Sequence, residues 1–548
     1  MAESMQTKLR RAALKTRQRE VEQCLAEHGL SRGPRRLLRD ASRFDERTHC
    51  RRLREALVRL GPVFSSFGIY LSSRVDLLPV SYCLELSAVP DRTEPDPLVS
   101  IREMFRRSVG CRPEEAFVEF DAEPFESRLL FQSHHAWLEA DGPVTVKLMR
   151  CEIEEQIETD SRLLPLLKDA LATLDLAQLQ IDLAIADFHR ALRRQMDLNQ
   201  ELGSLEAFAH DSKEFTMLAA PRVHEKLCSS EVLTIERLSG TGLGDIVSSL
   251  DRNGGAAGID PGNLASTLCL VWLRQTLLGS LLPVEPLGTN VVVLPNQQIA
   301  FRGGSFAKLS TKVKANLWNY VTSASAEDFD KACSCLLTEM ELGKRSEPEK
   351  DLVNGFRQVV PFRDGGWSDS CNGTSLAEHL FVQWRLASRK GLRPQSHLID
   401  FYRGLFQVCA VARRLDTGRD SLREGLDNLR LMAALAQFRE MVGAQQLGES
   451  MDKYAAMMTE LPKKLDEVLT LAAEGSALVK LQVSQTSQRR KQKNSAAAAI
   501  ALSTILVSCA LLSQELAGSA MGGVWIDRIG AVALVFIGGM LLRVVIRR

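Results

Sequence analysis

Two uncharged stretches near the C-terminus constrain the architecture of this chain more than any other feature of its 548 residues. The first runs for 21 residues between Lys493 and Glu515, and the second for 14 residues from Ile529 to Leu542. At about 1.5 Å rise per residue, the first stretch is long enough to cross the hydrocarbon core of a bilayer. The second stretch alone would also suit a buried helix. Because the two are joined by a short link, we predict a transmembrane helical hairpin over residues 494–546.

Flanking charges give the predicted hairpin a direction. Cationic side chains lie outside both apolar stretches, at Arg489, Arg490, Lys491, Lys493, Arg543, Arg547 and Arg548. The connecting loop carries Glu515 and Asp527, with Arg528 at its end. Since Lys and Arg accumulate on the cytoplasmic side, both ends of the hairpin are expected there. We therefore expect an inner (cytoplasmic) membrane protein with most of its chain in the cytoplasm and membrane lipid as one partner.

Charge is distributed unevenly, although the net charge is only +1. Residues 1–60 contain 16 Lys and Arg but 8 Asp and Glu, and basic ends of this kind often lie against nucleic acid or anionic lipid. No motif that reads bases accompanies the charge, so nucleic acid is not an expected partner. The 12 cysteines are scattered without a ligand-like cluster, which predicts free thiols in a reducing compartment and no metal site.

Hydrophobic periodicity predicts a helix-rich α+β protein with the element order of a two-lobed protein kinase. Alternation at residues 144–148 places Val144, Val146 and Leu148 on one face of a strand and Lys147 on the other. Long helical stretches follow, and residues 291–294 and 299–301 read as a β-hairpin. The predicted parts are a basic helical extension (1–110), a kinase-like N-lobe (111–238), a helical C-lobe (239–480) and the hairpin (494–546).

Several runs give the chain a resemblance to the UbiB/AarF/ADCK family of atypical kinase-like proteins, which are associated with ubiquinone biosynthesis. The strongest is LGPVFSSFGIYLSSR at residues 60–74, followed by DLLP at 76–79. The family pattern there is LGPxFxKxGQxxSxR, then DLxP. Glu119-Phe-Asp-x-Glu-Pro124, Val146-Lys-Leu-x-Arg150 and Glu155-x-x-Glu-Thr-Asp160 appear at the expected distances.

Departures from the family pattern fall on the positions that carry chemistry. Where the family has the Lys and Gln of its KxGQ motif, this chain has Ser66 and Ile69. The family's Ala-rich nucleotide loop aligns with residues 126–129 of this chain. Backbone N–H groups of such a loop approach phosphate closely, and here Glu126 and Arg128 bring bulk and charge into that space. The bulky Phe131 replaces a glycine of the family pattern.

The resemblance also marks residues that would contact nucleotide. Lys147 matches the family's strand lysine, and the two helix glutamates align with Gln195 and Glu201. Glu236 takes a hinge-like position, with a plain strand-end carboxylate as an equal alternative. The fourth candidate is Asn290, in the catalytic-loop segment.

The catalytic loop itself is altered. The family sequence HxDxxxxN corresponds here to residues 283–290, so that Glu285 replaces the catalytic aspartate. The metal-binding aspartate of the Asp-Phe-Gly segment falls on Arg302 or, without a gap, on Gly303. Phosphoryl transfer requires charge neutralisation on the transferring oxygens, and little in this set supplies it.

These substitutions predict a degenerate member: a membrane-anchored pseudokinase that acts as a scaffold or regulator in isoprenoid-quinone or related lipid metabolism. Expected partners are other quinone- or lipid-pathway proteins, an intact UbiB-type relative among them, and no cofactor is required. The alternative is a divergent ATPase or atypical kinase that uses ATP and Mg²⁺ through Lys147, Glu201, Glu285 and Asn290. On the first hypothesis, Glu285 and Asn290 have no remaining chemical step.

Overall fold

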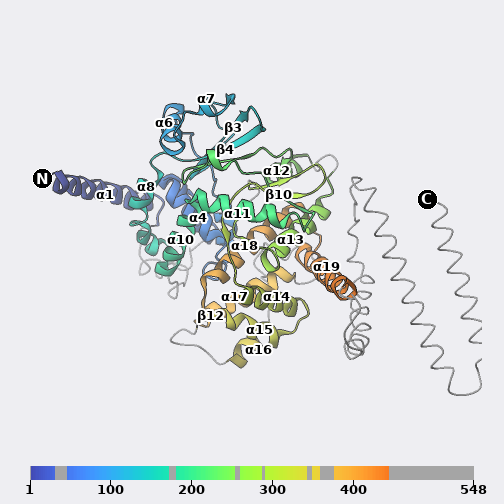
Figure 1. Cartoon of the computed structure of the whole chain (residues 1–548). Helices are drawn as coiled ribbons and strands as arrows, with labels where there is room; N and C mark the ends of the chain where they lie inside the picture. Colours follow the sequence, from blue (N-terminus) through green and yellow to red (C-terminus); the bar gives the residue numbers. More distant parts are fainter. Residues whose placement is uncertain are drawn as a thin grey trace, which may run out of the picture. The chain divides into compact units, whose positions relative to one another are not determined.

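The computed structural model describes residues 2–30, 46–171, 181–253, 259–286, 290–341, 349–357, 375–416 and 418–443. Helices predominate, and the strands form small sheets (Figure 1). The predicted hairpin at 494–546 lies outside the described residues. None of the described helices is both long enough and apolar enough to cross a membrane.

The first sheet forms the small lobe. Its strands pair antiparallel in the order β1, β3, β4, β6, with β2 also on β3: β1 (Glu119–Phe120), β2 (Glu126–Ser127), β3 (Phe131–Leu138), β4 (Gly142–Met149) and β6 (Val232–Glu236). Val144, Val146 and Leu148 of β4 are fully buried, whereas Lys147 points to the other face. The predicted strand and its alternation are therefore confirmed. Helix α6 (Leu98–Val109) covers this core with Ile101 and Phe105.

Helices make up most of the described sequence between β4 and β6, as the periodicity predicted. They are α8 (Ile153–Asp160), η2 (Leu164–Leu167), α9 (Lys168–Leu171), α10 (Ile181–Gln195) and α11 (Leu198–Asp211). Asp197 is the N-cap of α11, because its carboxylate accepts hydrogen bonds from the N–H groups of Asn199 and Gln200. This cap fixes the first turn of α11, which carries Glu201.

The large lobe is built around α13 (Pro261–Leu277), most of whose residues are buried. Asp260 caps this helix by accepting from the N–H of Gly262, and Pro261 at the first position needs no N–H partner. Around it lie α12 (Leu243–Asn253), α14 (Thr311–Ser325), α15 (Phe329–Thr338), α16 (Glu349–Arg357), α17 (Leu376–Arg389), α18 (Ser396–Leu415) and α19 (Ser421–Gly443).

Short strands accompany these helices. The predicted β-hairpin is confirmed by the antiparallel pair β9 (Val291–Val293) and β10 (Ile299–Phe301). β10 also pairs with β5 (Leu218–Ala219), and β9 also pairs with β7 (Thr241–Gly242). Two further pairs are β8 (Leu282–Pro283) with β11 (Phe306–Ala307) and β12 (Met340–Glu341) with β13 (Arg393–Pro394). The last pair lies in a part of the predicted helical C-lobe for which no strands were predicted.

The N-terminal helices share the large core. They are α1 (Ala2–Glu27), α3 (Glu46–Leu60), α4 (Pro62–Ser72) and α5 (Val80–Leu86), followed after α6 by α7 (Pro113–Ala116). Gly61, with φ of 101°, and Pro62 at the start of α4 make the turn between α3 and α4. Leu60-Gly-Pro62 therefore marks a sharp helix-to-helix junction.

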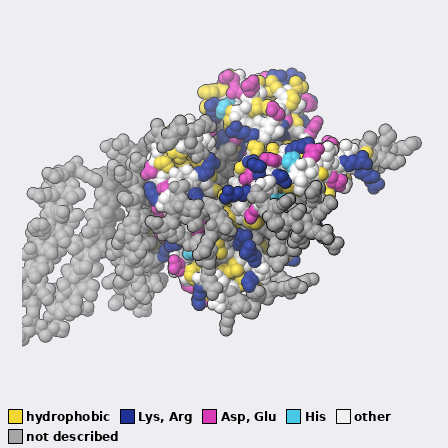
Figure 2. All heavy atoms as spheres, turned by 180° about the vertical axis from the view of Figure 1, so that it is seen from behind, with side chains coloured by type: hydrophobic (Ala, Val, Ile, Leu, Met, Phe, Trp, Pro, Cys, Tyr) yellow, Lys and Arg dark blue, Asp and Glu magenta, His cyan; other side chains and the backbone are white. Residues whose placement is uncertain are grey.

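Basic side chains of this region pair with acidic ones. Arg17 of α1 contacts Asp160 of α8 at 2.8 Å, and Arg59 of α3 contacts Glu27 at 2.6 Å. Figure 2 shows Lys and Arg interspersed with Asp and Glu on the face opposite to that of Figure 1. Part of the N-terminal cationic charge is thus neutralised within the fold.

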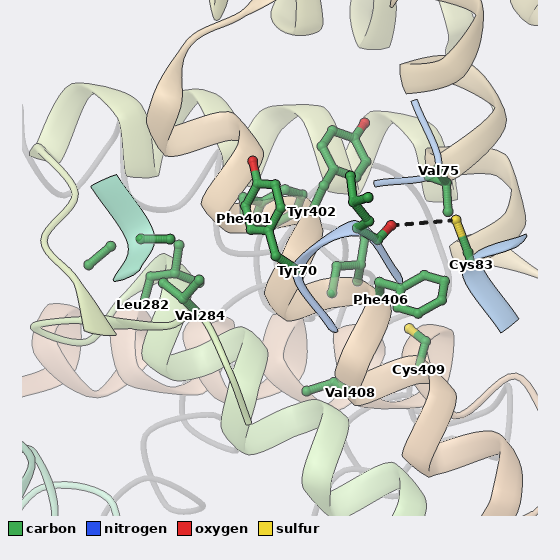
Figure 3. Close-up of a cluster of buried hydrophobic side chains, with 14 of the residues drawn as sticks. Tyr70, Val75, Cys83, Leu282, Val284, Phe401, Tyr402, Phe406, Val408 and Cys409 are labelled. Atoms are coloured by element: carbon green, nitrogen blue, oxygen red, sulfur yellow. Dashed lines mark hydrogen bonds between the residues drawn. The ribbon is translucent and has the colours of Figure 1, made fainter. Parts of the chain in front are cut away.

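Helix α18 joins the N-terminal helices to the large lobe. Figure 3 shows Tyr70 of α4 and Cys83 of α5 in one buried cluster with Phe401, Tyr402 and Phe406 of α18. All five side chains are almost completely buried. The segment predicted as an extension therefore packs into the core of the large lobe, and α6 packs onto the small lobe. The domain boundaries proposed from sequence remain predictions.

Candidate nucleotide-type site between the lobes

Lys147 and Glu201 form a buried ion pair across β4 and α11. The Lys147 Nζ lies 2.7 Å from one carboxylate oxygen of Glu201 and 2.9 Å from the other. The two side chains are 13% and 4% exposed. The Glu201 carboxylate also accepts a hydrogen bond of 3.0 Å from the N–H of Gly304, and the ammonium lies 4.2 Å from the centre of the Phe131 ring. The structure thus brings together Lys147 and Glu201, two residues singled out from the sequence. The partners named here are all groups of the protein itself.

Glycine is required where the segment after β10 passes this pair. A Cβ at Gly303 would lie 2.3 Å from Glu201 Oε1 and 3.8 Å from Lys147 Nζ. In the ungapped alignment, the metal-binding aspartate of the family corresponds to Gly303. That position lies beside Lys147 and carries no side chain. Arg302 turns elsewhere, and its guanidinium contacts the Glu126 carboxylate at 3.2 Å.

Glu285 is held by two side chains of the same chain. Arg403 of α18 and Gln195 of α10 each donate a hydrogen bond to its carboxylate. Arg403 is 2% exposed, and its guanidinium lies 4.7 Å from the centre of the Tyr70 ring. Asp400, one turn earlier on α18, binds Arg194 through two hydrogen bonds of 2.9 Å. The two helices are therefore linked by a buried ionic network that includes the catalytic-loop position.

Arg128, in the segment that aligns with the family's nucleotide loop, binds Asn290. The Arg128 guanidinium donates a hydrogen bond of 2.7 Å to Asn290 Oδ1 and lies 2.5 Å from the Asp91 carboxylate. Burial alone would lower the pKa of Arg128, but the carboxylates of Asp91 and Glu126 outweigh it, so the pKa is raised. The guanidinium stays charged and occupies the side of Asn290 from which a metal ion would be bound.

Phe125 and Glu126, just before Arg128, make one aromatic contact within the small lobe and two contacts with Arg302 of the segment after β10. The Phe125 ring stacks on His135, with centroids 4.0 Å apart and planes inclined by 4°. Arg302 lies over the same ring at 5.6 Å while pairing with Glu126. We call Phe125, Glu126 and Arg128 with their partners Arg302 and Asn290 the interlobe clasp.

The space left in the site is small. A cavity of about 60 Å³ is lined by Lys147, Glu201, Glu285 and Asn290 together with Ser66, Ile69 and the two arginines Arg128 and Arg403. Sites for ligands of drug size measure roughly 300–1,000 Å³. Glu236 does not line this cavity; it ends β6, is exposed, and accepts from the N–H of Arg222. Four of the sequence-derived candidates therefore converge on the cavity with Ser66 and Ile69, while Glu236 and Arg302 lie outside it.

The residues present do not fit a magnesium–nucleotide complex in this arrangement. Mg²⁺ is usually held by one or two carboxylates with phosphate oxygens. Here the Glu285 carboxylate is bound by Arg403, the Asn290 amide oxygen by Arg128, and Glu201 by Lys147. Among the residues that the structure describes, no group of three or more His, Cys, Asp or Glu could hold a metal ion. We derive no phosphoryl-transfer step from this site.

Asp91 and Arg403 escaped the sequence analysis. Asp91 follows a helix in a polar stretch, and Arg403 lies in a helix whose pattern indicates only burial of one face. A buried arginine in an otherwise apolar stretch is a signal that it has an anionic partner. That signal does not identify the partner, which is 118 residues away.

The two lobes with a strand lysine paired to a helix glutamate define the class of this protein: an atypical kinase-like fold. Residues 88–336 match the ABC1 atypical kinase-like domain. The chain is 30% identical over 382 residues to a UbiB protein of Azotobacter vinelandii, covering 68% of this chain and 69% of that relative. It therefore belongs to the UbiB family.

Two further relatives and one solved structure are similar to this chain. A UbiB protein of Xylella fastidiosa, described like that of Azotobacter as a probable protein kinase, is 27% identical over 476 residues, covering 82% of this chain and 79% of that one. An uncharacterized protein in the hydrogenase 1 5′ region of Clostridium pasteurianum is 24% identical over 287 residues, covering 52% of this chain and 53% of that one. Among solved structures, the complex of Rv3197 with erythromycin from Mycobacterium tuberculosis matches with a TM-score of 0.40 and 16% identity, covering 63% and 83%.

Proposed function

We propose that this UbiB-family chain is a pseudokinase that serves as a membrane-anchored scaffold or regulator in isoprenoid-quinone or related lipid metabolism. One observation carries the proposal: Arg128 binds Asn290, and Arg403 binds Glu285, at the positions where a kinase would hold metal and catalytic base. The pair of Arg403 with Glu285 is a buried ion pair, and removing one partner of such a pair costs about 3–5 kcal/mol. The quinone pathway is taken from the resemblance to the UbiB family, which is associated with ubiquinone biosynthesis.

The proposal predicts that purified full-length protein neither hydrolyses ATP above background nor is stabilised by it. We would measure phosphate release and the midpoint of thermal unfolding with millimolar ATP, with and without Mg²⁺. A ligand at 100 times its Kd adds about 2.7 kcal/mol, which such a melt readily detects. No shift is expected in either condition.

Lys147→Ala and the matched variant Lys308→Ala separate specific turnover from contamination. Lys308 is an exposed lysine outside the cavity. Turnover that disappears in Lys147→Ala but persists in Lys308→Ala would overturn the pseudokinase proposal. It would favour the alternative, a divergent ATPase or atypical kinase supporting ubiquinone biosynthesis with ATP and Mg²⁺.

Partners and location complete the proposal. We expect the C-terminal hairpin to hold the chain at the inner membrane, with other quinone- or lipid-pathway proteins, an intact UbiB-type relative among them, as binding partners. Purification from detergent with identification of bound proteins and lipids tests this directly. Recovery of nucleic acid as the main bound material, in place of such proteins or lipids, would contradict it.

A further inference from the structure

Helix α19 changes character halfway along its length. In its first half, Leu422, Leu426 and Leu429 are almost completely buried. A Cβ at Gly425 would lie 2.8 Å from the backbone nitrogen of Leu270, so α19 passes α13 closely at this point. The first half of α19 is therefore fixed to the core of the large lobe.

The second half of α19 contains a short apolar segment that the described fold leaves partly uncovered. Residues 431–436 read LMAALA, and no Asp, Glu, Lys or Arg occurs between Arg430 and Arg439. Each of the six side chains is at least partly exposed, with Met432 at 38% and Leu435 at 49%. In Figure 1 the C-terminal turns of α19 lie at the edge of the large lobe. We call residues 431–436 the apolar turns of α19.

The apolar turns surround the helix axis and do not form a stripe on one face. Successive residues of an α-helix are rotated by about 100°, so six in a row cover more than a full circle. A helix that docks in a protein groove carries an apolar stripe opposite a polar face, whereas apolarity all round indicates burial in a protein core or in lipid. Among the described residues no core encloses these turns, because all six side chains keep exposed surface. Lipid is therefore the surrounding that fits them.

Length limits how deep these turns can enter a membrane. Six helical residues rise about 9 Å, much less than the hydrocarbon core of about 30 Å. A segment of this size fits the boundary between headgroups and acyl chains, at a depth of about 5–10 Å. Its few side chains bury less apolar surface than one acyl chain, which alone binds only marginally and reversibly. Such a contact can orient the large lobe but cannot hold the chain at a membrane.

We propose that the apolar turns of α19 lie in the headgroup–acyl boundary of the bilayer and orient the large lobe on it. The exposed side chains of Met432 and Leu435 then contact lipid, and the end of α19 is directed toward the membrane. This inference rests on the proposed function, because the predicted hairpin at 494–546 keeps the chain at the bilayer.

Photocrosslinking of full-length protein in phosphatidylcholine vesicles tests the contact. Leu435→p-benzoylphenylalanine puts the photoreactive group on α19, and Trp137→p-benzoylphenylalanine puts it on the small lobe, where Trp137 is equally open at 48% exposure. Phosphatidylcholine carries no net charge, and attraction of basic segments requires anionic lipid, so an adduct reports apolar contact. Mass spectrometry should find about tenfold more lipid adduct in the Leu435 variant than in the Trp137 variant.

The outcomes separate this inference from the proposed function. Vesicle flotation shows whether the chain is anchored at all, and a chain that does not float overturns both. A chain that floats but gives no lipid adduct at Leu435, or as much adduct at Trp137, overturns this inference alone. An adduct of Leu435 with protein in place of lipid also overturns it, because a protein surface then covers the apolar turns.

A charged substitution in the apolar turns gives an independent check. With the photoreactive group at Leu435, Met432→Asp should lower the lipid adduct about tenfold, because it puts a carboxylate into the apolar contact. Val99→Asp makes the same change on α6, where Val99 is 75% exposed, and should leave the adduct unchanged. If Met432→Asp lowers the midpoint of unfolding, Ala436→Asp at an exposed position provides the same comparison. Equal adducts in the α19 and α6 variants would refute the contact.

Discussion

At the residue scale, two arginines of the chain bind polar groups at the positions that align with the metal-binding and catalytic residues of the family. Arg128 and Arg403 lie 162 and 118 residues from the groups they bind, Asn290 and Glu285. A guanidinium neutralises a buried carboxylate as a metal would, but it is part of the fold and cannot be exchanged for Mg²⁺ during a reaction. The polar residues Glu285 and Asn290 therefore have a structural role in this arrangement.

Glu285 provides the sharpest test of that role. Sequence alone left it without a chemical step, which predicted that Glu285→Ala would be harmless. In the structure, that change leaves Arg403 buried without its principal anion, and removing one partner of a buried pair costs about 3–5 kcal/mol. We expect a clear drop in the midpoint of thermal unfolding of Glu285→Ala, measured by circular dichroism.

Two further variants check the cause of that drop. Adding Arg403→Met to Glu285→Ala should restore much of the lost stability, because the unpaired charge is then gone. Glu114→Ala breaks an exposed pair with Arg102, in which both side chains are nearly half exposed, and should cost no more than about 1 kcal/mol. If Glu285→Ala is as mild as Glu114→Ala, the pair with Arg403 has no structural role.

The site could be predicted from sequence only where a local pattern marked it. Alternation around Lys147 gave its strand and face, and family spacing indicated Glu201. The partners Asp91 and Arg403 could not be assigned, because nothing local in a sequence specifies which distant carboxylate or amide a buried arginine meets. Closure of the cavity depends on those long-range pairs.

At the scale of elements, β4 carries the small lobe. Val146 is completely buried between β3, β6 and α6. Val146→Asp would put an unpaired carboxylate into this core, and we expect a loss of roughly 4 kcal/mol or more in the free energy of unfolding. Sensitivity to limited proteolysis and the unfolding midpoint would both report it.

Val118→Asp is the matched control for that substitution. Val118 is 69% exposed at the edge of the same sheet, and its contact there is a backbone hydrogen bond to Trp137. The same chemical change should shift stability by about 0.5 kcal/mol or less. Similar protease sensitivity of the two variants would show that β4 does not hold the small lobe together.

Long or strongly alternating elements were predictable, and very short ones were not. β4 alternates with a period of two, and the β9–β10 hairpin consists of two apolar runs separated by a turn. The strands β12 and β13 have two residues each, and their paired residues Met340 and Pro394 lie 54 positions apart in the sequence. No periodicity exists in two residues, so that pairing depends on the packing of the surrounding helices.

At the scale of the whole molecule, the N-terminal helices and α18 share one core, so the region predicted as an extension is integral to the described fold. The basic N-terminus is partly neutralised by Asp160 and Glu27. Membrane attachment through surface charge alone should therefore be weak and removable by salt, since screening at 1 M acts beyond about 3 Å.

Attachment through the C-terminal hairpin should instead resist salt, because burial of two apolar segments does not depend on screened charge. Full-length protein should stay in the membrane pellet after a wash with 1 M salt, whereas a chain truncated after Lys493 should be released. In the full-length chain, Leu506→Arg with Val507→Arg puts two charges near the middle of the first stretch, each costing about 2.5–3.5 kcal/mol, and should weaken retention. Immunoblots of pellet and supernatant decide the matter. Identical retention of the truncated and full-length chains through the salt wash would exclude the hairpin as the anchor.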